Sequence, residues 1–169
     1  GYIAMTPVQN NITLNAFREA FDSSPRVLEQ LKAFEEFCKV GLPTNKSEEY
    51  RFTPVGKFLE ANFDLAMYGQ SSESKFEPES SDHEITINII NGRLANTIQR
   101  EELTVSVNHS VSTVHSADPF NLLNKAFNNE EINIQVGSDI LMDRVVKINH
   151  ILNSESEQLM VNPRIVLNI

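Results

Sequence analysis

The hydrophobic period changes once along this chain of 169 residues, and the change limits the folds that it can adopt. Before residue 70, apolar residues recur at the spacing of amphipathic helices. From Ile85 onward they alternate with polar residues, which is typical of strands with one buried face. The sequence therefore predicts an α+β protein, with a small helical region at residues 1–69 and a mainly β region at residues 84–169.

Residues 70–83 separate these two regions. This stretch is rich in serine and acidic residues and contains almost nothing that could be buried. Such a composition cannot offset the entropy of folding, so we expect an exposed linker here.

Three short helices are expected in the helical region, over residues 14–21, over residues 24–40, and from Thr53 onward. A serine or threonine followed by proline opens each of the last two, because the hydroxyl caps the helix and the proline fits its first turn. The faces expected to be buried are Leu14, Phe17 and Phe21 in the first helix, Val27, Leu31, Phe34 and Cys38, widened by Leu28 and Phe37, in the second, and Val55, Phe58, Leu59 and Phe63 in the third.

The segment between the second and third helices, residues 41–55, reads GLPTNKSEEYRFTPV. Gly41 can adopt the left-handed conformation that closes a helix, and Pro43 prevents the helix from resuming. Charged residues bracket Tyr50 and Phe52, so we expect both rings to be buried while the charges stay in water. Residues 41–55, called the connector below, are thus interpreted as a structured link and not as a catalytic motif.

Strands are expected around Ile85, Ile87 and Ile89, followed by a hairpin at Asn91-Gly92. Asp118-Pro119 opens one helix, at residues 118–127. Further strands are expected at residues 105–107, 132–136, 146–152 and 164–169, with Val146, Ile148 and Leu152 on one face. The alternation by itself is equally compatible with a small antiparallel sheet or a sandwich.

The net charge of −9 argues against nucleic acid and anionic membrane surfaces as partners. The single cysteine, Cys38, excludes an internal disulfide and fits a reducing compartment. No apolar run reaches the length of about 18 residues that a membrane-spanning helix needs. Residues 1–10 lack the features of a signal peptide. A cytoplasmic protein is therefore expected.

No residue is assigned a catalytic, cofactor-binding or metal-binding role. Cys38 lies on an apolar helix face, where a free cysteine behaves as a small hydrophobe. The histidines fit no zinc spacing, and His109, His115 and His150 are expected on apolar strand faces as hydrogen-bonded core residues. The fourth is His83.

The carboxylates likewise predict no active site. Glu48-Glu49 and Glu101-Glu102 are neighbours in sequence, so their side chains should point apart and form no acid–base pair. A β-helical carbohydrate enzyme would need clustered carboxylates, and Asp118, Asp139 and Asp143 are too scattered for that. The chain is therefore not expected to be an enzyme.

Several segments, in order, resemble the SufB/SufD family of iron–sulfur cluster assembly proteins, and the SufD branch in particular. The connector is the most distinctive, because it is similar to the family segment GLPT-x-K-x-E-E-aromatic-basic-aromatic-T. Tyr50 stands where the family more often has tryptophan. The other matching segments are Ile90-Asn91-Gly92-Arg93, residues 118–127, residues 132–136 with Val145-Val146, and residues 162–166.

The resemblance implies a helical N-terminal region followed by the opening rungs of a right-handed parallel β-helix. It also implies a non-catalytic scaffold subunit, with SufB and the ATPase SufC as partners. The iron–sulfur cluster and ATP belong to the assembly and not to this segment. The family's functional cysteine and histidine positions lie beyond Ile169, so none is carried over, and the chain is expected to be part of a longer protein.

An alternative stays open on the sequence alone. The chain could be a stand-alone α+β interaction module unrelated to iron–sulfur assembly. The edge of its last strand, at residues 164–169, would then serve as the docking surface.

Overall fold

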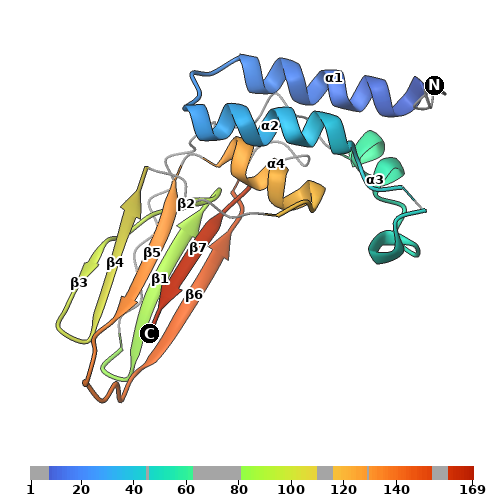
Figure 1. The fold of residues 1–169 in the computed structure, drawn as a ribbon. Coiled ribbons are helices and arrows are strands. Elements are labelled where there is room, and N and C mark those ends of the chain that lie inside the picture. The colour runs from blue at the N-terminus through green and yellow to red at the C-terminus, as the bar shows by residue number, and fades with distance from the viewer. Residues whose placement is uncertain (1–7, 45, 63–80, 110–115, 129, 154–159) are drawn as a thin grey trace. The chain divides into compact units, whose positions relative to one another are not determined.

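The computed structural model describes residues 8–44, 46–62, 81–109, 116–128, 130–153 and 160–169 (Figure 1). The chain divides into two compact units. The helical unit comprises Gly1–Tyr68, Thr113–Phe127 and Gln158–Met160, and the β unit comprises Gly69–Ser112, Asn128–Glu157 and Val161–Ile169. Most of the linker expected at residues 70–83 lies outside the described residues, as do Phe63 and His115.

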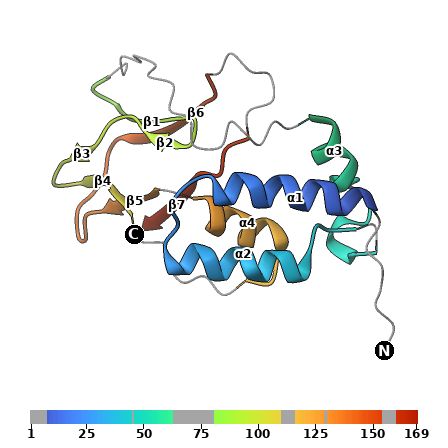
Figure 2. The ribbon, with the colours of Figure 1, turned by 90° about the horizontal axis from the view of Figure 1, so that it is seen from above.

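The helical unit contains the three helices expected from the sequence and a fourth from later in the chain. These are α1 (Val8–Asp22), α2 (Leu28–Val40), α3 (Val55–Asn62) and α4 (Pro119–Phe127), with the short 3-10 helix η1 (Glu48–Tyr50) in the connector. Figures 1 and 2 show α1, α2 and α4 side by side. Helix α4 belongs to the helical unit although strands precede and follow it in the chain.

The core of the helical unit is aromatic. Phe21 of α1 stacks on Phe34 of α2 with ring centroids 4.2 Å apart. Phe127 of α4 meets the edges of both rings, at 5.7 Å from Phe21 and 6.0 Å from Phe34. Because α4 also buries Leu123 and Ala126, it closes a core that α1 and α2 would otherwise leave open to water.

Helix α2 differs from its sequence-based prediction in both its start and its buried face. It begins at Leu28 with Val27 at the N-cap, so Ser24 is not the cap. The Val27 N–H donates to Oε1 of Gln30 at 3.1 Å, which satisfies one of the free donors at the helix start. Phe34 and Phe37 are buried as expected, together with Ala33, whereas Val27, Leu28 and Leu31 are exposed.

The connector closes α2 as predicted but buries only one of its two aromatic rings. Gly41 has a φ of 74°, and its N–H donates to the Phe37 carbonyl at 2.7 Å. Tyr50 is half-buried against the core, whereas Phe52 is 92% exposed, with Arg51 stacked over its ring. In α3, Phe58 is also exposed, contrary to the expected face, while Val55 and Leu59 are buried.

The β unit consists of two mixed sheets. The first has the strand order β2-β1-β6, built from β1 (Glu84–Ile90), β2 (Arg93–Leu94) and β6 (Val145–Ile151). The second has the order β3-β4-β5-β7, built from β3 (Ile98–Gln99), β4 (Leu103–Asn108), β5 (Glu131–Val136) and β7 (Arg164–Asn168). Strand β1 pairs in parallel with β6, and β5 pairs in parallel with β7, while the other pairs are antiparallel.

The hairpin predicted at Asn91-Gly92 joins β1 to β2. Ile90 pairs with Arg93, so the loop has two residues, and both have positive φ, 50° at Asn91 and 82° at Gly92. Positive φ at both positions is the signature of the type I′ turn that suits the twist of paired strands. After the turn the chain forms two short strands, β2 and β3, which belong to different sheets.

Branched aliphatic side chains form the core of the β unit. Ile85, Ile87 and Ile89 of β1 pack with residues of the other sheet, namely Leu103, Val105, Ile132 and Ile134. The fold is therefore α+β, as predicted. The parallel β-helix implied by the family resemblance is not confirmed, because the described sheets neither curl nor close and three of their five strand pairs are antiparallel.

Strand β6 is less buried than expected. It lies at the edge of its sheet, where Ile148 is 40% exposed, and Leu152 just beyond the strand is 63% exposed. Val146, opposite Ile85, does pack on the core. None of the described helices is long and apolar enough to span a membrane.

Candidate functional site

An open pocket of about 730 Å³ lies in the helical unit, between the connector and the segment that leads into α4. One part of its lining is apolar, with the rings of Pro43 and Pro119 and the side chains of Val40 and Ala117. The polar lining residues are Ser47, Glu48, Glu49, Tyr50, Ser116 and Asp118. A pocket with both kinds of surface suits a ligand that has an apolar stem and a polar or charged end.

A hydrogen bond between Tyr50 and Asp118 holds the two sides of this pocket together. The Tyr50 hydroxyl donates to Oδ2 of Asp118 at 2.6 Å. The Tyr50 ring also packs against Phe120 of α4, with ring centroids 5.5 Å apart. The connector is thereby fixed to the start of α4 by one polar and one aromatic contact.

Asp118 is fully engaged in this structural role. Its Oδ1 accepts hydrogen bonds from the backbone N–H groups of Phe120 and Asn121, both at 3.0 Å, which makes Asp118 the cap of α4. Its Oδ2 accepts from Tyr50. Both carboxylate oxygens therefore have partners within the protein, and Asp118 contributes negative charge to the pocket.

The same hydrogen bond raises the pKa of Tyr50 to about 12, with burial and the negative charges of Asp118 and Glu49 acting in the same direction. Ionising the phenol would remove the donated hydrogen and place two anions in contact. Tyr50 is therefore a neutral hydrogen-bond donor at physiological pH.

Glu48 and Glu49 supply the remaining charge of the pocket. Both border it from η1, although they are neighbours in sequence. In the part of the chain that the structure describes, neither forms an ion pair with a lysine, arginine or histidine, and no basic residue lines the pocket. The charged residues among those described in the pocket lining are therefore all acidic.

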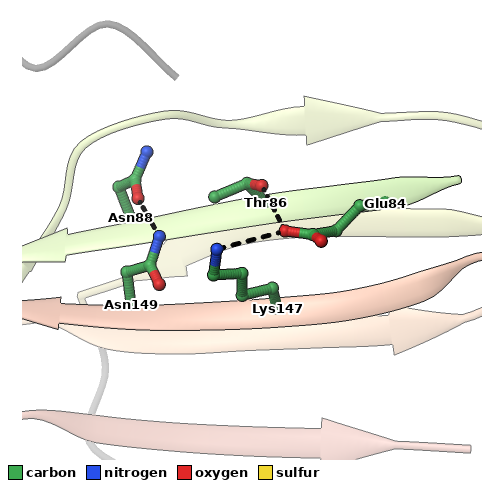
Figure 3. A network of polar contacts seen from close by, with 5 residues as sticks. All are labelled: Glu84, Thr86, Asn88, Lys147 and Asn149. Atoms are coloured by element: carbon green, nitrogen blue, oxygen red, sulfur yellow. Dashed lines mark hydrogen bonds and ion pairs between the residues drawn. The ribbon is translucent and has the colours of Figure 1, made fainter. Parts of the chain in front are cut away.

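A second polar cluster lies on the β unit, across the parallel pair β1–β6 (Figure 3). Lys147 Nζ lies 3.3 Å from Oε1 of Glu84, and the Thr86 hydroxyl approaches the same oxygen at 3.5 Å. Two positions along, Asn149 Nδ2 donates to Oδ1 of Asn88 at 2.9 Å. Lys147 is directly opposite Thr86 and lies two positions beyond Val145, the register partner of Glu84. Asn88 is directly opposite Asn149, so the cluster fixes strand register.

A buried ion pair fixes the other parallel pair. Arg164 Nε of β7 donates to Oε2 of Glu131 at the start of β5, at 2.9 Å. The Glu131 side chain is only 4% exposed and that of Arg164 is 15% exposed. Both parallel pairs of the β unit are thus aligned by charged or amide side chains, and these clusters have a structural role.

Cys38 is half-buried beside the helical core, as its sequence position predicted. Burial raises the pKa of its thiol, an effect that Arg18 opposes, since Arg18 Nη2 lies 3.5 Å from Sγ. A raised pKa keeps the sulfur protonated, which makes it a poor nucleophile and a poor metal ligand.

His109 and His150 do not lie on buried faces as expected, because both are exposed. His83 is exposed as well. Within the described ranges, no three histidine, cysteine, aspartate or glutamate side chains come together in a group that could hold a metal ion.

The remaining carboxylates considered in the sequence analysis have separate positions in the structure. Glu102 lies 3.7 Å from Arg144 and 3.9 Å from Arg100, so it serves as an ion-pair partner. Asp139 and Asp143 are exposed, and Asp118 caps α4.

The contact between Tyr50 and Asp118 was not predicted from the sequence. The two residues were each recognised, one in the connector and one at a helix start, but 68 positions separate them. The only signal that could have paired them is the polar tip of an otherwise buried tyrosine, which needs a partner.

The fold defines a class of protein in which a helical N-terminal region with an aromatic core accompanies a mixed β unit. Residues 15–81 match the family model described as the SufBD protein N-terminal region, so this part of the chain is similar to the N-terminal regions of SufB/SufD-family proteins. The match agrees with the family resemblance of the connector, and it does not separate SufD from SufB. The β unit beyond residue 81 lies outside it. No curated protein matches the chain.

Proposed function

We propose that this protein is a non-catalytic scaffold subunit of the SUF iron–sulfur cluster assembly machinery, and that it corresponds to the SufD member of the family. The observation that carries the proposal is the family match at residues 15–81, which covers α2, the connector, α3 and most of α1. The connector, with its GLPT start, and the N-terminal helices resemble SufD more than SufB.

The structural roles of several reactive side chains support a function in binding other proteins. Asp118 caps a helix, the Cys38 thiol has a raised pKa, and Glu131 is paired with Arg164. Each of these groups, which could otherwise perform chemistry, already has a structural task. A protein of this kind acts by presenting shape and charge to its partners.

The proposed partners are SufB and the ATPase SufC. The iron–sulfur cluster and ATP would then be handled by the assembled complex, with ATP bound by SufC. The proposed location is the cytoplasm, since a single unpaired thiol such as Cys38 is typical of proteins in a reducing compartment.

Co-purification tests the proposal. The full-length protein that carries this chain is tagged and mixed with untagged SufB and SufC, and a tagged acidic protein of similar size serves as the control for charge. We expect both partners to be retained with the protein in a fixed ratio and not with the control. Failure to retain either partner, at micromolar concentrations of all three, would overturn the scaffold role.

A further inference from the structure

The pocket between the connector and α4 carries negative charge that no structural contact described above accounts for. The hydrogen bond from Tyr50 to Asp118 joins its two sides, and Tyr50, Pro43 and Pro119 are among its lining residues. Two carboxylates, those of Glu48 and Glu49, border it without an ion-pair partner in the described part of the chain. Folding leaves this charge uncompensated.

We propose that the pocket receives an arginine or lysine side chain from a partner protein. The methylene stem of such a side chain would pack on Pro43, Val40 and Pro119, and its cationic head would reach Glu48 and Glu49. Long basic side chains bury their stems on apolar surface and keep the charge in water, and the lining of this pocket offers both environments.

Charge complementarity decides between a basic and a neutral occupant. Glu48, Glu49 and Asp118 all border the pocket, and none of the described residues that line it is a lysine or arginine. The nearest basic residue after η1, Arg51, lies over the ring of Phe52 at 5.7 Å and is therefore engaged elsewhere. A cation is attracted to such a site, whereas an anion is repelled, and the face of Tyr50 can add a cation–π contact.

The position of the pocket favours a protein as the source of the cation. One side of it is the connector, which lies within the matched SufBD region, and the other side is the start of α4, far along the chain. This inference deepens the proposed scaffold function, on which it rests, by naming the chemistry of one partner contact. A free polyamine has the same cationic chemistry, so the test must separate the two sources.

The test is an NMR titration of the ¹⁵N-labelled 169-residue chain with three probes. The first is a capped alanine hexapeptide with one central arginine, the second has citrulline in place of arginine, and the third is spermidine. Citrulline keeps the shape of arginine without its charge. We expect the arginine peptide to shift the amide signals of Ser47, Glu49 and Ala117 in a saturable way, with roughly millimolar affinity for an exposed ion pair.

Two double variants locate the binding groups. Glu48→Gln with Glu49→Gln should weaken binding of the arginine peptide roughly fivefold, because it removes two exposed ion pairs. The matched control, Glu35→Gln with Glu36→Gln, makes the same change in net charge on the exposed face of α2 and should leave binding unchanged. The spectra themselves show that each variant is folded.

Four results would overturn the proposal: no saturable shift with the arginine peptide, equal binding of the citrulline peptide, an equal loss in the control variant, or tighter binding of spermidine at the same amides. The last result would assign the pocket to a small polyamine. These results leave the co-purification with SufB and SufC untouched, so failure of the pocket and failure of the scaffold role are distinguishable.

Discussion

The hydroxyl of Tyr50 donates to Oδ2 of Asp118 at 2.6 Å, across 68 positions of sequence. This bond joins the connector of the SufBD region to α4, a helix that lies outside the matched residues. Asp118 in turn caps α4, whose Phe127 completes the aromatic core of the helical unit. The shape of the pocket and the stability of this unit therefore depend on the same carboxylate.

Substitution of Asp118 tests its double role. Asp118→Ala removes both the cap of α4 and the acceptor for Tyr50, so we expect the free energy of unfolding to fall by about 2 kcal/mol. Asp118→Asn keeps a good capping side chain and a neutral acceptor, so the loss should be about half as large. Urea denaturation followed by circular dichroism measures both values. Equal losses for the two variants would show that the cap carries little of the effect.

The raised pKa of Tyr50 predicts that the stability of the protein falls at high pH. Its pKa is raised to about 12 in the folded protein, above the value near 10 of an unperturbed tyrosine. A raised folded-state pKa means that the stabilisation is fully present below pH of about 10 and is lost as the pH rises through about 12.

The measurement compares the folded chain with Tyr50→Phe, which lacks the ionisable group. Below pH of about 10, the variant should be less stable by about 1 kcal/mol, because it lacks the hydrogen bond. The difference should shrink towards zero near pH 12, whereas other titrating groups affect both proteins alike. A difference that stays constant over this range would contradict the assigned hydrogen bond.

The sequence predicted those features that depend on local chemistry. The turn at Asn91-Gly92 needs two residues with positive φ, and the chain supplies asparagine and glycine, so the hairpin could be located without a structure. Gly41 closes α2 for a related reason. The connector was recognisable as a family segment because its residue types are unusual in that order.

Features that depend on distant partners could not be predicted. Leu31 and Phe58 lie on apolar helical stripes, yet both are exposed, because a stripe does not show which of its members another element will cover. Helix α4 was recognised in the sequence, but its membership in the helical unit follows from contacts between Phe127 and helices about a hundred residues earlier. The pocket beside Tyr50 depends on this same long-range packing.

The aromatic core predicts that loss of the Phe127 ring in α4 strongly lowers the free energy of unfolding. Phe127→Ala removes a fully buried ring that contacts Phe17, Phe21 and Phe34, so the free energy of unfolding should fall by about 3–5 kcal/mol. Phe52→Ala is the matched control, since its ring is 92% exposed, and it should change stability by less than about 0.5 kcal/mol. Thermal and urea denaturation measure both variants. A small effect at Phe127 would mean that α4 is not part of the helical core.

The two parallel strand pairs of the β unit offer a matched comparison of ion pairs. Arg164→Met leaves the carboxylate of Glu131 buried without its arginine partner, so it should cost about 3 kcal/mol. Lys147→Met removes the partner of Glu84, but that pair is exposed and surrounded by water, so the cost should be below about 1 kcal/mol. Both changes replace a cation with an unbranched apolar side chain. Urea denaturation of the two variants at neutral pH gives the comparison, and equal losses would show that burial does not set the strength of the Glu131–Arg164 contact.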